Sequence, residues 1–229
     1  MSIAIAKRVE PALLTDQVYE TIHQAILSGE LPGGSRLTVR ELADQVGTSA
    51  MPVREAIRRL EESGMVAREP HKGAVVKTLT LEELLHVYDM RRLLEVEAAR
   101  LGAPHVTAQD GDRMQAEYDL MLTAIREHEV IALLDHDEAL LEILYGRAGN
   151  PLLVRMIRNL WQQCRAYKIV GADGTLSAAG DDSLWRYQED LIAAARHRDP
   201  IAAAAVNEAS LANATDRIRK LLAAQTSAV

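Results

Sequence analysis

The sequence contains a single cysteine, Cys164, among its 229 residues. One cysteine cannot form an internal disulfide, which agrees with a reducing compartment, and we expect a cytoplasmic location. We interpret this thiol as a small buried hydrophobe on a helix and not as a catalytic nucleophile.

Long apolar runs are absent as well. No segment reaches the roughly 20 apolar residues that cross a bilayer, and the first ten residues are too short and too polar for a signal peptide. We therefore expect no membrane partner. The hydrophobic content of 48% and the charged content of 26% are ordinary for a globular protein, and the length suffices for two modest domains.

Motifs of enzymes are also missing from the second part of the chain. Residues 79–229 contain no paired carboxylates with a base, no nucleophile motif and no phosphate-binding loop. An enzyme domain fused to the first part of the chain is therefore the least favoured alternative. The histidines are scattered and show no metal-ligand spacing: His23, His86, His105, His128 and His197.

What is present, over residues 38–73, is the pattern of a winged helix-turn-helix. Thr38 and Glu41 have the spacing of a capping box, Gly47 permits a sharp turn, and Ser49 can cap a second helix. The apolar residues of the two helices recur at helical spacing: Leu42, Ala43, Val46, then Val53, Ala56, Ile57 and Leu60.

A small hairpin is predicted after the second helix. Residues 65–68 and 74–77 flank the basic segment 69–73 and read as two strands of a wing. A helix in the major groove with a wing on the backbone is the arrangement by which such modules bind DNA.

The net charge of −7 is unevenly distributed. Residues 1–78 carry 10 Lys and Arg against 10 Asp and Glu, whereas residues 79–229 carry 16 against 23. Because the first part is neutral overall, we expect modest nonspecific attraction, so DNA binding should depend on a docked dimer and on base contacts.

The rest of the chain is predicted to be helical. A first helix is expected over 9–31, and Thr80 and Glu83 form a second capping box that opens a series of helices. We expect a mainly α fold, with a winged helix-turn-helix DNA-binding domain at 1–78 and an antiparallel all-helical effector-binding and dimerisation bundle at 79–229. The helices of the bundle are predicted at 81–103, 107–127, 129–148, 151–170, 182–198 and 200–224, with a loop at 171–180.

Several strings in the sequence resemble the GntR family of bacterial regulators. They are Pro32–Leu37, Arg40–Ala43, Pro52–Ala56, Leu60, Gly64–Val66 and Lys72–Val75. The helical part resembles the FadR-type C-terminal domain, FCD, at residues 87–95 and 149–153. The resemblance implies a homodimeric regulator that binds a palindromic double-stranded DNA operator and senses a metabolite.

By this resemblance, DNA contacts come from the first helix of the motif, the start and centre of the recognition helix, and the wing tip. Arg58 joins them because it lies off the apolar stripe. The predicted residues are Arg40, Thr48, Ser49, Ala50, Met51, Arg54, Arg58, His71, Lys72 and Gly73. Ala50 stands where the family usually has an arginine. Since an arginine–guanine contact discriminates by about 1–3 kcal/mol, the half-site should differ there.

Many FCD domains hold a divalent metal with one aspartate and three histidines. At the positions that correspond by counting, this chain has Asp137, Leu141, Gln188 and Ser210. One carboxylate with an amide and a hydroxyl is a poor donor set for zinc or nickel, so we predict no metal and no cofactor.

Polar residues on apolar helix faces nevertheless predict a pocket inside the bundle. Arg91, Asp137 and Gln188 each interrupt such a face. We expect Arg91 and Arg165 to bind a carboxylate or phosphate of a small-molecule effector such as an organic acid, with hydrogen bonds from Gln188. Leu141 and Ser210 complete the predicted set. One alternative is a buried Arg91–Asp137 ion pair that only fixes helix register. Another is a helical domain that only dimerises.

Overall fold

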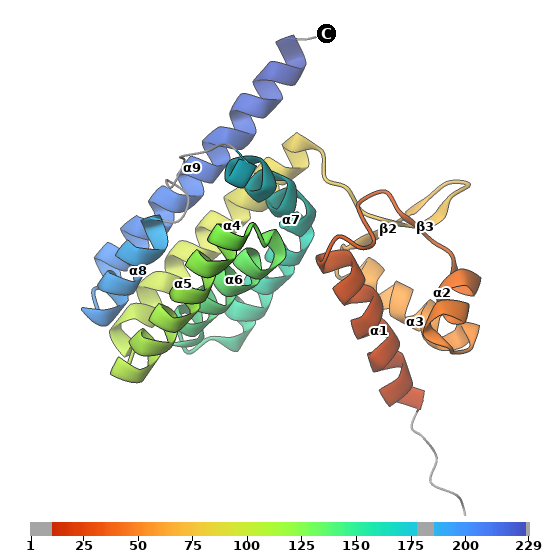
Figure 1. Ribbon diagram of the computed structural model, residues 1–229, viewed down its shortest axis with the longest axis horizontal. Helices are drawn as coiled ribbons and strands as arrows, with labels where there is room; N and C mark the ends of the chain where they lie inside the picture. Colours follow the sequence, from red (N-terminus) through yellow and green to blue (C-terminus); the bar gives the residue numbers. More distant parts are fainter. Residues whose placement is uncertain (1–10, 178–185, 228–229) are drawn as a thin grey trace, which may run out of the picture. The chain divides into compact units, whose positions relative to one another are not determined.

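The structure is a computed structural model, which describes residues 11–177 and 186–227. The chain divides into two compact units, Met1–Thr78 and Leu79–Val229 (Figure 1). Residues 9–10 of the expected first helix, 178–180 of the expected loop and 182–185 of an expected helix lie outside the described residues.

The first unit has three helices and a small sheet among its described residues. Its elements are α1 (Pro11–Leu27), β1 (Arg36–Leu37), α2 (Val39–Val46), α3 (Ala50–Glu62), β2 (Val66–Glu69) and β3 (Gly73–Val76). Helix α1 packs on α3. The predicted apolar faces meet in one core, whose fully buried members include Val18, Val53, Ala56 and Leu60.

The sheet has three antiparallel strands in the order β1-β3-β2 and not the two that the sequence predicts. Strand β1 pairs Arg36 with Val75, and β2 pairs Val66 with Val76. A strand of two residues is too short to show any alternation of polar and apolar residues, which is why the sequence pattern does not reveal it.

Some predicted helix ends in this unit are wrong. Neither Thr38 nor Ser49 makes a side-chain capping hydrogen bond, so the capping box at Thr38 is absent. Helix α1 ends at Leu27 and not at residue 31, because Gly29 adopts a φ of 78° and turns the chain. Gly47, with a φ of 72°, ends α2 as predicted.

The second unit is an all-helical bundle across its described residues. Its elements are α4 (Leu81–Gly102), the 3-10 turn η1 (Ala103–His105), α5 (Ala108–Glu127), α6 (Val130–Gly146), α7 (Pro151–Ser177), α8 (Arg186–Arg196) and α9 (Pro200–Ser227). Helix α4 packs against α9, α7 and α6, and α5 packs along α6 (Figure 1). The predicted capping box opens α4, with the Glu83 amide donating to Thr80 Oγ1 at 3.1 Å. The mainly α fold class is confirmed.

Helix α7 continues to Ser177, so the predicted loop is wrong over residues 171–177. Ala172 is buried against the main core of the unit, and this packing outweighs the low helix propensity of Gly171 and Gly174. A further capping box, between Thr107 and Asp110, opens α5 and was not predicted.

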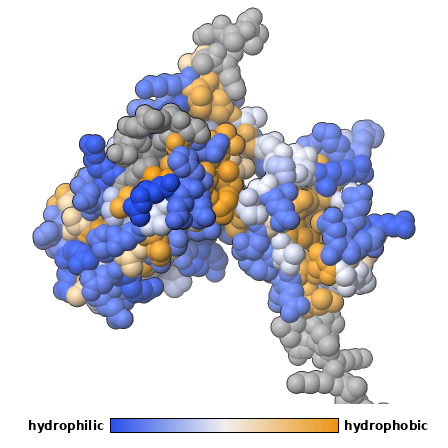
Figure 2. All heavy atoms as spheres, in the orientation of Figure 1, coloured by the Kyte–Doolittle hydropathy of each residue, from blue (hydrophilic) through white to orange (hydrophobic). Residues whose placement is uncertain are grey.

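The interior of the second unit is closely packed. Cys164 is fully buried beside Tyr88 and Leu211, as expected for an apolar role, and burial raises the pKa of its thiol. Gly102 of α4 lies so close to α6 that a Cβ would collide with the carbonyl oxygen of Leu144. Hydrophilic residues cover much of the visible surface (Figure 2). No helix among the described residues is long and apolar enough to cross a membrane.

Candidate functional sites

The start of α3 is exposed, with Met51 75% exposed. Two hollows flank it, and Arg54 lines both. The smaller, about 470 Å³, contains the predicted residues Arg40, Thr48, Ala50 and Arg54. The larger, about 910 Å³, contains the predicted residues Ser49, Met51, Arg54, Arg58, Lys72 and Gly73. His71 lines neither hollow; it sits at the exposed wing tip with a φ of 66°.

The basic side chains of this surface differ in whether they form ion pairs with carboxylates of the protein. Arg40 and Arg54 form no ion pair with any described residue. Arg58 is bound by two carboxylates: its Nε donates to Glu55 at 3.0 Å, and it also pairs with Glu62. The hydrogen bond and charge of Glu55 raise the pKa of Arg58. A phosphate must therefore compete with glutamates for Arg58, but not for Arg54.

Two further arginines of the larger hollow were missed by the sequence prediction. Arg36 comes from β1 and has no ion-pair partner among the described residues, whereas Arg68 of β2 pairs with Glu61 at 2.9 Å. Arg36 could have been found only by recognising β1, because the pairing of that strand with β3 brings it beside the wing.

Arg59, by contrast, holds the unit together. Its guanidinium lies 4.3 Å from the ring centroid of Tyr19 and 2.6 Å from Asp16, both on α1. These contacts tie α3 to α1, which orients the exposed start of α3.

A cavity of about 460 Å³ opens in the second unit, with walls from α4, α6, α7, α8 and α9. Four predicted effector residues line it: Arg91, Asp137, Gln188 and Ser210. A polar chamber of about 50 Å³ shares these four and adds Leu141. Five of the six predicted effector residues are thus brought together, although the first and last of them, Arg91 and Ser210, are more than a hundred residues apart in the sequence.

Arg165 is the exception, and its inclusion is corrected. It lines neither cavity, and its guanidinium pairs with Asp135 and, at 3.2 Å, with Glu138. Both carboxylates lie on α6, so the charge of Arg165 is already compensated.

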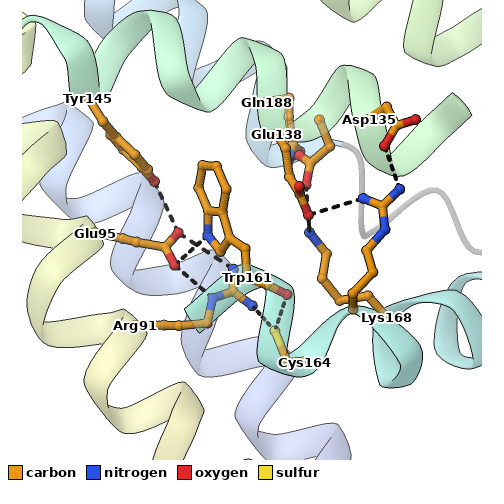
Figure 3. Close-up of polar contacts among 11 residues, drawn as sticks. Arg91, Glu95, Asp135, Glu138, Tyr145, Trp161, Cys164, Lys168 and Gln188 are labelled. Atoms are coloured by element: carbon orange, nitrogen blue, oxygen red, sulfur yellow. Dashed lines mark hydrogen bonds and ion pairs between the residues drawn. The ribbon is translucent and has the colours of Figure 1, made fainter. Parts of the chain in front are cut away.

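The proposed Arg91–Asp137 pair is also wrong. Arg91 pairs with Glu95 one turn along α4, with Nε 2.7 Å from Oε1 (Figure 3). Glu95 accepts further hydrogen bonds from Trp161 Nε1 at 2.9 Å and from the Tyr145 hydroxyl at 3.2 Å. The carboxylate is fully buried, and its neighbours satisfy it from α4, α6 and α7.

Asp137 instead contacts an amide and a lysine. Gln188 Nε2 donates to Asp137 Oδ1 at 2.6 Å, and Lys168 Nζ lies 3.5 Å from Oδ2. Lys168 also donates to Glu138 at 2.9 Å. Burial opposes the charge of Lys168, but Glu138 and Asp137 outweigh it and raise its pKa, so the ammonium stays protonated. Lys168, a lone lysine on a long helix, was not predicted.

The larger cavity has a basic lining. Its charged residues are Arg91, Lys168, Arg217 and Lys220 against Asp137 alone. Arg217 and Lys220, on α9, form no ion pair with any described residue. The remaining wall is largely apolar and aromatic: Tyr88, Leu134, Tyr167, Ala172, Leu211, Ala214 and Leu221.

The residues present do not fit a divalent metal. The Asp137 carboxylate already faces the Lys168 ammonium and the Gln188 amide N–H, and Leu141 has no donor atom. Zinc and nickel require imidazole, thiolate or several carboxylates. Within the described ranges, no group of three His, Cys, Asp or Glu is placed to hold a metal ion.

Family models match both units. The model described as bacterial regulatory proteins, gntR family, matches residues 14–76, and that of the FCD domain matches residues 86–213, more than half of the chain. Both domains are regulatory and not enzymatic, as the sequence predicted.

Individual relatives and a solved structure agree. The chain is 28% identical over 148 residues to the HTH-type transcriptional regulator McbR of Escherichia coli K12, covering 65% of this chain and 67% of that protein. It is 37% identical over 100 residues to a probable D-xylose utilization operon transcriptional repressor of Paenarthrobacter nicotinovorans, covering 44% of each. The chain thus spans about half to two thirds of these relatives' length.

The fold is shared with the structure of E. coli McbR/YncC. The two structures superpose with a TM-score of 0.77 at 24% sequence identity, over 91% of this chain and 98% of the McbR/YncC chain. The recognition helix and wing, the helical bundle and both family matches lead to one conclusion: the chain belongs to the GntR family and is a transcriptional regulator with a winged helix-turn-helix and an FCD domain.

Proposed function

We propose that this regulator is ligand-responsive: its FCD unit binds a small organic anion, and binding changes the affinity of a cytoplasmic homodimer for a palindromic operator. The observation that carries this proposal is the 460 Å³ cavity. Its volume lies in the range of small-molecule sites, and charged and amide groups converge on a wall that is otherwise largely apolar.

The charge of the lining supports an anion. Arg91 and Lys168 are neutralised by internal carboxylates, but Arg217 and Lys220 are not paired within the described residues. A carboxylate near these two side chains of α9 gains charge-assisted hydrogen bonds without breaking any ion pair that the structure contains.

A homodimer is supported by apolar side chains exposed on two helices that pack together. Met90 and Leu93 of α4 are 43% and 67% exposed, and Leu152 and Met156 of α7 are 53% and 44% exposed. Exposed apolar groups of this kind commonly mark association surfaces. Two copies place two recognition helices on half-sites about one helical turn apart, with a base preference at Ala50 that departs from the family's usual one.

Helix α4 gives a physical route from ligand to DNA. It begins three residues after the first unit ends, and it contributes Tyr88 and Arg91 to the cavity. A ligand that favours one placement of α4 therefore biases the arrangement of the two reading heads, since it stabilises one population over another.

The test combines thermal shifts with operator binding, using a panel of small carboxylates with and without EDTA. A carboxylate at 100 times its Kd should stabilise the protein by about 2.7 kcal/mol, and it should change operator affinity. Arg217→Gln should weaken this binding, whereas Arg219→Gln on the same helix, an exposed residue paired with Asp216, should not.

Two outcomes would contradict the proposal. If no organic anion shifts the melting temperature or the operator affinity, the helical unit serves dimerisation only. If stabilisation needs nickel or zinc and EDTA abolishes it, the metal-free assignment of Asp137 and Gln188 is wrong.

A further inference from the structure

The side-chain amide of Gln188 forms a hydrogen bond through its nitrogen, but its oxygen forms none with any described residue. Nε2 donates to Asp137 at 2.6 Å, which fixes the orientation of the amide, because the reverse would set two oxygens against each other. Oε1 is buried and accepts no hydrogen bond from any described residue. The residue as a whole is only 8% exposed.

The two cations that line the large cavity on α4 and α7 are engaged elsewhere. The ammonium of Lys168 lies between Glu138 and Asp137, and the guanidinium of Arg91 is held by Glu95. Buried polar atoms nearly always have a partner, and one without a partner calls for an explanation. Gln188 lines both the large cavity and the small polar chamber, so a molecule in the cavity is the available source of a donor.

We propose, on the basis of the effector site above, that the effector carries an N–H or O–H donor besides its anionic group, and that this donor binds Oε1 of Gln188. The anionic group lies toward Arg217 and Lys220 of α9, and the donor lies toward Asp137 and Gln188 of α6 and α8. The effector is thus an amino or hydroxy acid and not a simple carboxylic acid.

Matched trios of ligands test this in the full-length wild-type protein. Each trio has one carbon skeleton with hydrogen, hydroxyl or ammonium at one position: propionate, lactate and alanine, or butyrate, 4-hydroxybutyrate and 4-aminobutyrate. The affinity of each member is measured by titration calorimetry. In the trio whose carbon skeleton fits the cavity, the hydroxy or amino acid should bind at least about tenfold more tightly than the unsubstituted acid, a difference of about 1.4 kcal/mol. The hydroxyl and ammonium arms identify which donor is used.

A substitution then assigns the preference to the amide. In Gln188→Met the preference should fall to within about twofold, while the plain carboxylate binds as before. Gln115→Met is the matched control, because Gln115 also donates to an aspartate, Asp119, at 3.0 Å, but on the exposed surface of α5. It should leave every affinity unchanged.

The outcomes separate this inference from the proposed function. If plain carboxylates bind as tightly as their donor-bearing partners, the inference is overturned and the anion site stands. If Gln188→Met keeps the preference, the donor binds elsewhere and the inference also fails. If no carboxylate binds at all, the proposed function itself is wrong. Should Gln188→Met not fold, the wild-type trios alone decide.

Discussion

Replacing Glu95 by glutamine is expected to destabilise the FCD unit strongly. Glu95 is 1% exposed, pairs with Arg91 and accepts a hydrogen bond from Trp161. The amide keeps the volume of the side chain but removes its charge. Arg91 is then buried without a counter-charge, and removing one partner of a buried pair typically costs about 3–5 kcal/mol.

The loss of stability can be measured as a fall in the melting temperature. For a unit of about 150 residues, each kcal/mol lowers the melting temperature by about 2–4 °C, so Glu95→Gln should melt about 6–20 °C below the parent. Urea unfolding followed by tryptophan fluorescence and circular dichroism gives the free energy of unfolding independently.

Glu97→Gln is the matched control for this substitution. Glu97 also pairs with an arginine of α4, Arg100, at 2.8 Å, but at the surface, where such pairs contribute little. If Glu95→Gln melts within a degree or two of Glu97→Gln, the buried pair does not stabilise the unit and the reasoning is refuted. In Arg91→Met/Glu95→Met, which leaves no buried charge of this pair, much of the loss should be recovered.

Three more substitutions test other parts of the chain. Arg54→Ala should weaken operator binding about 10- to 100-fold in an anisotropy titration, because Arg54 has no ion pair among the described residues. Arg58→Ala should weaken it far less, since glutamates compensate that charge; equal effects would contradict the assignment. Hydrogen bonds from Arg147, which is half-exposed, and from Thr107 lower the pKa of Asp110 to about 2. The ionised carboxylate therefore contributes about 1 kcal/mol to the free energy of unfolding above pH 4, and this contribution is lost as the pH falls toward 2. Asp110→Asn should therefore approach the parent in melting temperature over that range, and a constant difference would refute this. Both buried ring nitrogens of His23 lack a hydrogen-bond partner among the described residues, and the nearest carboxylate, that of Glu20, is 3.9 Å from Nδ1. His23→Leu should therefore raise stability by about 1 kcal/mol, unlike exposed His86→Leu, and a loss of stability would refute this.

Periodicity and helix-capping patterns were enough to predict most of the fold. Helical spacing located the helices of both units to within a few residues, except at the end of α7, and the Thr80–Glu83 box marked the start of α4. The errors have physical causes. β1 is too short to show a pattern, and α7 continues through two glycines because Ala172 packs in the core.

The residues of the candidate cavity were predictable in part. A polar residue on an apolar helix face is predicted to be buried, but the pattern does not show which residue it pairs with. Arg91, Asp137 and Gln188 are all buried, as expected. Their partners depend on tertiary contacts that no spacing rule gives for Lys168, which lies on another helix. The Arg91–Glu95 pair is different: its spacing of four residues is visible in the sequence, and a local partner was available before a distant one.

The pairing of these groups changes which residues we expect to meet the effector. The sequence alone points to Arg91 and Arg165 as the cations of the site, yet both form ion pairs with carboxylates of the protein. An anion could bind either arginine only by displacing its carboxylate partner. Displacement would leave a buried carboxylate without its partner, which is costly. Arg217 carries no such penalty, since no described carboxylate holds it. Gln188 gains from a ligand because its carbonyl oxygen has no donor among the described residues. Specificity in this cavity should therefore come from Arg217, Lys220 and Gln188, whose polar groups are not fully paired by the described residues, and not from the fully paired network around Glu95.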